Sequence, residues 1–166
     1  MKTLVFSFVF LSASAAWSAK LEGRDAASLV QILHNSKILT YAGGATAEKD
    51  GQRLVGSMFD GSVCGTNEFK SLNVRVQTGR LQCKASKQAV WDIECILVGF
   101  GASPKVVNER GLQAAHLYHL LEEAKAPSRQ GTGGAGGNAT ILEVPSLNCS
   151  LQGFNLCKGI AVCDFP

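Results

Sequence analysis

The chain has 166 residues, of which 46% are hydrophobic, and its 16 basic and 13 acidic residues give a formal net charge of +3. Because this charge is small and scattered along the sequence, it argues against nucleic acid or an anionic membrane surface as the partner. A chain of this length can bury a hydrophobic core, so its six cysteines are expected to staple a packed domain rather than to replace its core.

The N-terminus has the pattern of an export signal. Lys2 precedes an apolar run from Leu4 to Leu11, and residues 13–18 offer two small-x-small cleavage patterns. The run is too short to span a bilayer, and no later stretch approaches ~18 continuous apolar residues. We therefore expect residues 1–18 to be a signal peptide and residues 19–166 to form one compact domain, in the periplasm or outside the cell.

Two segments of the chain resemble each other. Residues 23–33 and 111–121 share a glycine, an Ala-Ala pair, a leucine and a closing leucine at the same positions. Each segment is followed by a Leu-x-Cys pattern and by a further cysteine. The sequence therefore predicts a tandem pseudo-repeat with units at 21–98 and 106–166, each a helix followed by antiparallel strands.

Each of these segments has the periodicity of a helix with one buried face. Apolar residues recur at i, i+3, i+4 and i+7, starting at Ala26 in the first unit and at Ala114 in the second. We expect the first helix to span about 21–36. The second should run from Asn108 or Glu109 to Ala124, because Pro127 prevents its continuation.

The strands of the first unit are predicted from alternation and turn signals. Two Asp-Gly pairs bracket residues 53–59 and favour a strand there, in a region with no counterpart in the second unit. Apolar residues then alternate over 72–76, at 81 and 83, and over 91–97. A turn at Thr78-Gly79 would join the first two of these segments, which predicts a three-stranded antiparallel meander.

The second unit begins after a Gly- and Pro-containing linker at 99–105. Residues 129–138 are glycine-rich, so we expect a flexible loop, and surface loops often carry function. The candidate binding residues in this loop are Arg129, Gln130, Gly131, Thr132 and Asn138. Strands are predicted to follow at 140–144, 147–151 and 154–163.

The repeat reduces the possible disulfide pairings. Cys83 matches Cys149 and Cys95 matches Cys163, so each unit is expected to staple its own hairpin through Cys83–Cys95 and Cys149–Cys163. Cys64 and Cys157 would then join the two units. Within the second hairpin, pairing of Cys157 with Cys149 or Cys163 is the alternative.

Catalytic and metal-binding patterns are weak. His116 and His119 have a spacing that could hold a metal ion with His34 or Glu123, but a solvated helix face is the better explanation. Asp92 and Glu94 would point the same way from one strand, as paired carboxylates do in glycosidases, yet a solvent-facing side of the strand suffices. We therefore predict neither a catalytic residue nor a metal site.

Cofactor and nucleophile motifs are equally weak. The spacing Gly131-x-Gly133-x-x-Gly136 resembles a dinucleotide fingerprint, but here it follows a helix and precedes a strand, the reverse of what that mechanism requires. The sequence has no Gly-x-Ser-x-Gly elbow, and a reactive cysteine would break the even pairing. We expect no cofactor.

Together these patterns predict an α+β fold in which two helices pack on one face of a disulfide-stabilised antiparallel sheet. The leading functional hypothesis is an exported, non-enzymatic recognition or inhibitor-like module. It would bind an extracellular or periplasmic protein or polysaccharide through its loops. The alternatives are a small exported hydrolase using Asp92 or the two helix histidines, and a structural component of the cell envelope.

Overall fold

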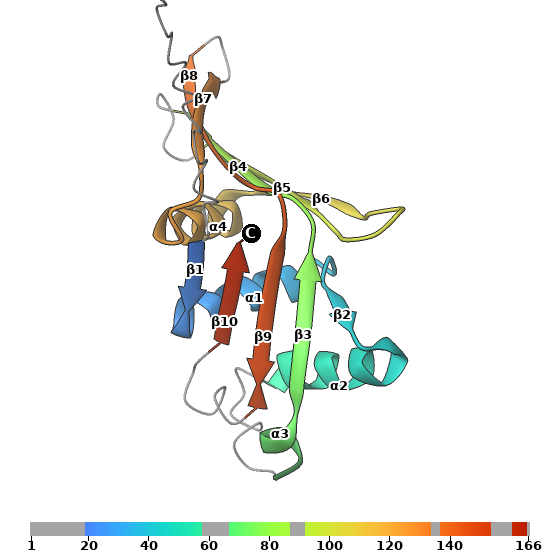
Figure 1. Ribbon diagram of the computed structural model, residues 1–166. Helices are drawn as coiled ribbons and strands as arrows, with labels where there is room; N and C mark the ends of the chain where they lie inside the picture. Colours follow the sequence, from blue (N-terminus) through green and yellow to red (C-terminus); the bar gives the residue numbers. More distant parts are fainter. Residues whose placement is uncertain (1–18, 58–66, 87–91, 134–136, 154–160, 166) are drawn as a thin grey trace, which may run out of the picture.

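The computed structural model describes residues 19–57, 67–86, 92–133, 137–153 and 161–165, which form helices and two antiparallel sheets (Figure 1). This is the α+β class expected from the sequence. The predicted signal peptide, Cys64 and Cys157 lie outside the described residues, and so does the beginning of the strand predicted at 154–163.

The elements follow one another in two series. The first series is β1 (Ala19–Glu22), α1 (Gly23–Asn35), β2 (Thr40–Ala42), α2 (Gly44–Ser57), α3 (Asn67–Ser71), β3 (Asn73–Thr78), β4 (Leu81–Ser86) and β5 (Ile93–Val98). The second series is β6 (Val106–Arg110), α4 (Gly111–Glu123), β7 (Ser128–Thr132), β8 (Asn138–Val144), β9 (Leu147–Gln152) and β10 (Ala161–Phe165).

The strands form two sheets rather than the single combined sheet that we predicted. One sheet has the order β1-β10-β9-β3-β2 and contacts α1, and the other has the order β6-β5-β4-β8-β7 and contacts α4. The two helices also contact each other. A single sheet carrying both helices is therefore wrong, because each helix covers a sheet of its own.

The two sheets are connected by one continuous two-stranded ribbon. Thr78 of β3 lies opposite Leu147 of β9, and Leu81 of β4 lies opposite Val144 of β8, so the register is unchanged across the gap between the two ladders. Figure 1 shows β3 running on into β4 and β8 into β9. The predicted meander is therefore wrong in one respect: β3 pairs with β9 and not with β4, although β4 and β5 do form a hairpin.

The strand predicted at 53–59 is also wrong, since the described part of that segment belongs to α2. Leu54 and Val55 are buried and Gly51 packs on the same side, which is the spacing of a helix with one buried face. A Cβ on Gly51 would lie 2.2 Å from Cδ1 of Tyr41. Gly51 therefore serves a close helix-to-strand approach, and not the turn that Asp50-Gly51 suggested.

Two segments contain strands that we did not predict. Residues 106–110 form β6 and pair with β5, although we expected the second helix to begin at Asn108 or Glu109, so 99–105 is the connection of a hairpin. Residues 128–132 form β7 at the edge of the second sheet, paired with β8. The loop prediction rested on glycine content, but Gly131 lies within β7, where a Cβ would meet the end of the Ile141 side chain.

Helices α1 and α4 begin in the same way. Each follows a strand, and each starts at a glycine with positive φ, 71° at Gly23 and 70° at Gly111. This conformation favours glycine because it has no Cβ, and it reverses the chain so that the helix lies back on a sheet. Both helices are thus confirmed, with starts a few residues later than predicted.

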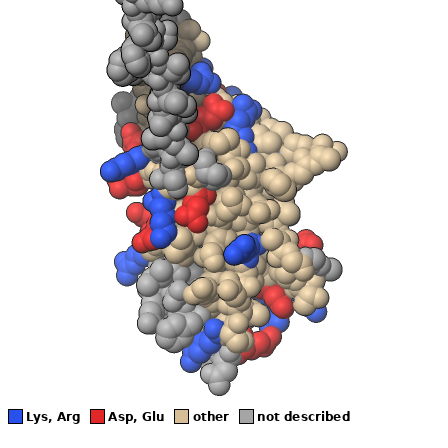
Figure 2. All heavy atoms as spheres, viewed as in Figure 1, with Lys and Arg blue, Asp and Glu red and all other residues tan. Residues whose placement is uncertain are grey.

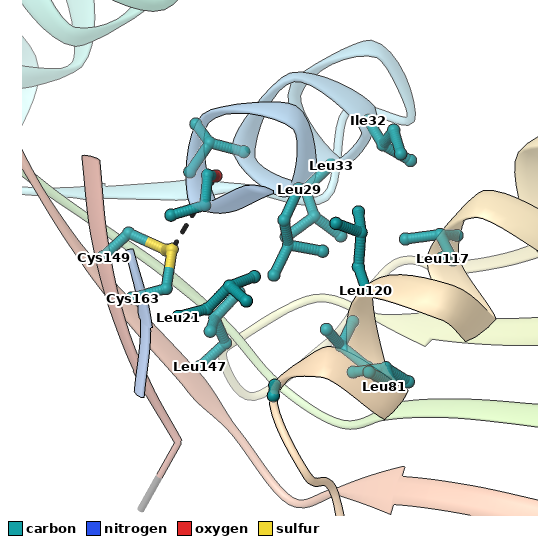
Figure 3. Packing of buried hydrophobic residues seen from close by; sticks show 14 of the residues in the cluster. Leu21, Leu29, Ile32, Leu33, Leu81, Leu117, Leu120, Leu147, Cys149 and Cys163 are labelled. Atoms are coloured by element: carbon teal, nitrogen blue, oxygen red, sulfur yellow. Dashed lines mark hydrogen bonds between the residues drawn. A yellow bond between two sulfur atoms is a disulfide. The ribbon is translucent and has the colours of Figure 1, made fainter. Parts of the chain in front are cut away.

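The hydrophobic core lies where both helices meet the sheets. Figure 3 shows Leu29 and Leu33 of α1 facing Leu120 and Leu117 of α4, with Leu21, Leu81 and Leu147 of the strands close by. All seven leucines are at most 5% exposed. Burying one such side chain stabilises a fold by roughly 1.5–3 kcal/mol, so this shared core is a main source of stability.

Both predicted hairpin disulfides are present, Cys83–Cys95 and Cys149–Cys163. In each, the two cysteines face each other on adjacent antiparallel strands, with Cα atoms 4.1 and 4.0 Å apart. The hairpin bearing Cys83–Cys95 lies under α4, and the hairpin bearing Cys149–Cys163 lies under α1. Each staple therefore supports the helix of the other series.

Candidate functional site

A cleft of about 490 Å³ lies between the end of α1, β2 and α2. Its volume is in the range of small-molecule sites. Six of the seven lining residues have polar side chains, while apolar atoms contribute about half of the lining surface. The lining residues are His34, Asn35, Lys37, Leu39, Tyr41, Glu48 and Gln52.

Two side-chain contacts order the groups in this cleft. Nδ1 of His34 lies 3.1 Å from the hydroxyl oxygen of Tyr41, and Nε2 of Gln52 donates to Oε1 of Glu48 over 3.3 Å. Tyr41 is held from behind by Gly51 and Val74, since a Cβ on Gly51 would overlap the ring and would lie 2.9 Å from Cγ1 of Val74. The tyrosine hydroxyl is therefore fixed relative to the helix end.

The protonation states in the cleft follow from burial. Burial lowers the pKa of His34 below its ordinary 6.5, so its imidazole is neutral at pH 7. Burial, followed by the negative charge of Glu48, raises the pKa of Tyr41 to about 12. At neutral pH the ionised side chains among the lining residues are thus one cation, Lys37, and one anion, Glu48.

The cleft lies at the end of α1, in the first half of the chain, and the corresponding end of α4 differs from it. An offset of 88 positions places Glu122, Glu123 and Lys125 where α1 has His34, Asn35 and Lys37. Lys37 and Lys125 even share a positive φ, 57° and 54°. What differs is α2, which forms one wall of the cleft, and the described residues contain no such helix between β7 and β8. Sequence reasoning noted this extra segment but did not recognise it as a wall.

A second prominent feature is the hairpin connection between β5 and β6, residues 99–105. Figure 1 shows it (yellow) extending beyond the rest of the fold. Phe100 and Val106 are each 57% exposed at this end of the hairpin. Figure 2 shows the protrusion with no charged side chain at its tip on the face in view, whereas Lys, Arg, Asp and Glu are intermixed elsewhere. The protruding hairpin thus carries two exposed apolar side chains, and its tip is uncharged on that face.

The predicted binding loop is instead part of the edge of the second sheet. Arg129, Gln130 and Thr132 are exposed on β7, Gly131 is partly buried, and Asn138 is exposed on β8 opposite Thr132. Arg129 lies 3.5 Å from Glu143 on the neighbouring strand. Residues 134–136 of the predicted loop lie outside the described residues.

The candidate carboxylate pair does share one hollow. Asp92 and Glu94 line a depression of about 130 Å³ with Lys84 and Ser86. Glu94 is ion-paired with Arg110 at 2.7 Å, and Asp92 is exposed. A glycosidase needs one carboxyl group in an apolar pocket that raises its pKa, and the lining of this hollow is polar.

The helix histidines do not converge with a third ligand. His116 and His119 are exposed on α4, and the nearest ionisable partner of His119 is Glu123 at 3.9 Å. Within the described ranges, no group of three or more His, Cys, Asp or Glu side chains could hold a metal ion.

Comparison with known proteins gives no further assignment. No family model, curated protein or solved structure matches the chain. The functional argument therefore depends on the geometry of the cleft and of the hairpin.

Proposed function

We propose that this protein is an exported, non-enzymatic recognition module that binds another protein through the hairpin between β5 and β6. The observation that carries the proposal is the exposure of Phe100 and Val106 on a protruding connection. Aromatic residues are frequent anchors of protein interfaces, because one large ring fills a pocket of the partner. A protruding hairpin with exposed apolar side chains suits a partner with a concave surface.

The base of the hairpin is held firmly, which favours binding. The backbone N–H of Gly79 and the hydroxyl of Thr78 both donate to the carbonyl oxygen of Val98, over 2.9 and 3.0 Å. On the other strand, Nζ of Lys105 donates to the carbonyl oxygen of Ser36 over 3.2 Å. A tip that is already ordered loses little conformational entropy on binding, so more of the contact energy contributes to affinity.

A polar cluster further fixes the hairpin to the end of α1. The Ser36 hydroxyl lies 2.9 Å from Oε1 of Glu109 on β6, and Nε2 of Gln113 on α4 donates to the same hydroxyl over 3.4 Å. Ser36 is buried and its bonds to Glu109 and Gln113 are part-buried, so they are only partly accessible to water. The cluster couples the position of β6 to the rigid helix and keeps the tip in one orientation.

We infer that this scaffold arose from two copies of one unit. Equating β1, α1, β2, β3, β4 and β5 with β6, α4, β7, β8, β9 and β10 turns the strand order of one sheet into that of the other. The matched glycine starts of the helices and the matched disulfides support the same equivalence. In this view the hairpin is the junction between the copies, and so it is free to vary without disturbing either sheet.

Export is the second part of the proposal. Disulfides persist in oxidising compartments, and the structure has two. None of the helices in the described residues is long and apolar enough to cross a membrane. No described residue arrangement favours the hydrolase alternative, since Glu94 is neutralised by Arg110.

The test is a comparison of three purified chains used as bait in fluid from the compartment where the protein is found. One chain is unchanged, one carries Phe100→Ser and Val106→Ser, and the control carries Leu112→Ser, which removes an apolar side chain that is 88% exposed on α4. We expect a protein captured by the unchanged and control chains to be lost with the double variant. Loss of an interface anchor should weaken binding of that purified protein by about 30-fold or more.

Equal capture by all three chains, or no captured protein, would show that the hairpin is not the binding element. Circular dichroism and urea unfolding establish that the double variant retains its fold, since both substituted side chains are solvent-exposed.

A further inference from the structure

We infer that the cleft formed by α1, β2 and α2 binds a neutral saccharide, such as one end of an uncharged polysaccharide chain. This inference is independent of the hairpin proposal, because it depends on a different surface of the molecule. It follows from the charge balance of the cleft, from its polar side chains and from the apolar part of its lining. The role of α2 supports it.

The charge balance favours an uncharged ligand. Lys37 and Glu48 carry opposite charges, and the imidazole of His34 is neutral at pH 7. A phosphate, sulfate or uronate group attracted to Lys37 would also approach the carboxylate of Glu48. A cation attracted to Glu48 would likewise approach the ammonium group of Lys37. A ligand with no net charge avoids both repulsions.

The polar groups of the cleft suit hydroxyl groups. Asn35 and Gln52 each present an amide that can donate and accept, Glu48 accepts, and Lys37 donates. A sugar hydroxyl also donates and accepts at once, so neighbouring hydroxyls of one ring can bond in pairs to such planar groups. The existing Gln52–Glu48 bond holds two of these groups in a fixed relation before binding.

The apolar part of the lining suits the carbon face of a sugar. Tyr41 is partly buried and lines the cleft with its ring backed by Gly51 and Val74, and Leu39 adds aliphatic surface. Aromatic rings with a polar end bind ligands that are apolar on one face and polar at the edge.

The position of the cleft against α2 indicates a specific role for this helix. The equivalent end of α4 carries Glu122, Glu123 and Lys125 but lacks a covering helix among the described residues. If the chain contains two copies of one unit, α2 is an addition to one copy. It contributes Glu48 and Gln52 to the site, together with the glycine that admits Tyr41.

The test uses the full chain, purified from an oxidising secretory host, on an array of defined oligosaccharides. The neutral probes are the tetramers of cellulose, laminarin, xylan, mannan and chitin. The charged probes are tetragalacturonate and a heparin tetrasaccharide, with free glutamate and lysine as non-saccharide controls in solution. We expect saturable binding to at least one neutral probe, measured by calorimetry, and no binding to the charged ones.

Asn35→Ala and Gln52→Ala test the site itself, because both side chains are exposed and their removal should not unfold the protein. Each should weaken binding about tenfold, the effect of one lost hydrogen bond. The matched control is Glu123→Ala, the position in α4 equivalent to Asn35, which should bind as the unchanged chain does.

Binding to charged probes or free amino acids alone, binding to none of the probes, or equal loss in the control variant would each overturn the inference. The hairpin variant with Phe100→Ser and Val106→Ser should bind the saccharide normally, so failure of the cleft and failure of the hairpin are separately visible.

Discussion

Ala26 and Ala114, 88 positions apart, lie in matching surroundings: both are completely buried, and the carbonyl oxygen of each contacts the second cysteine of a cross-strand disulfide. Sγ of Cys163 lies 4.0 Å from the Ala26 oxygen, and Sγ of Cys95 lies 3.4 Å from the Ala114 oxygen. These are packing contacts, because an oxidised sulfur has no proton to donate. In both cases the disulfide comes from the other series of elements, so each half of the chain packs its disulfide hairpin against the helix of the other half.

Removing either disulfide should destabilise the helix of the opposite half. Replacing Cys83 and Cys95 by alanine opens a short loop, of separation 12, and should reduce the free energy of unfolding by about 3 kcal/mol in the chain-entropy model. Hydrogen exchange should then accelerate most in α4, and in α1 when Cys149 and Cys163 are replaced. Faster hydrogen exchange mainly in α1 when Cys83 and Cys95 are replaced would contradict the packing of this disulfide against α4.

The first half of the chain should fold when expressed alone. Under the proposed equivalence of the two halves, residues 19–98 supply α1 and five strands that could form one complete sheet in the order β1-β5-β4-β3-β2. Either a turn at Thr78-Gly79 or exchange between two copies of the fragment would supply the missing pairings. We expect a cooperative unfolding transition and a formed Cys83–Cys95 bond, checked by circular dichroism and thiol alkylation. A fragment without cooperative unfolding would show that the halves are not equivalent.

Gly79 should tolerate no side chain. A Cβ there would lie 2.7 Å from the carbonyl oxygen of Gly99 and 2.9 Å from that of Val98, so Gly79→Ala must separate the ribbon from the hairpin base. We expect a loss of roughly 1–3 kcal/mol in urea unfolding. The control is Gly56→Ala in α2, where nothing lies within 4 Å of the added atom. That change should be neutral or stabilise by about 0.5–1 kcal/mol, because alanine favours helix.

The stability of the protein should fall with acidification because of His34. Burial lowers the pKa of His34. As the pH falls through the ordinary pKa of 6.5, this imidazole therefore takes up a proton in the unfolded chain but stays neutral in the folded protein. The contribution of His34 to the free energy of unfolding is therefore fully present above pH 6.5. It decreases as the pH falls to the pKa of His34 in the folded state. Comparing urea unfolding of the unchanged chain and His34→Gln at pH 7.5 and 5.0 removes the effect of other groups. An equal pH dependence in both chains would contradict this assignment.

The sequence by itself determined the features that depend on local periodicity. The apolar stripes beginning at Ala26 and Ala114 specify two helices with one buried face each. The alternation through Cys83 and Cys95 places both sulfurs on one side of a hairpin, and the same holds for Cys149 and Cys163. These features need no knowledge of distant residues, because the periods of a helix and a strand fix which side chains share a face.

The tertiary structure alone decided which strand pairs with β3. Leu81-x-Cys83 on β4 and Leu147-x-Cys149 on β9 carry the same pattern, and alternation specifies a face but not a partner. The turn signal at Thr78-Gly79 favoured pairing of β3 with β4. The chain does not reverse there, and β3 pairs with β9 instead. The cleft depended on the same kind of information, since Asp50-Gly51 signals a turn until Tyr41 is known to pack against Gly51. Contacts between residues far apart in sequence decided both outcomes, and a local pattern cannot encode them.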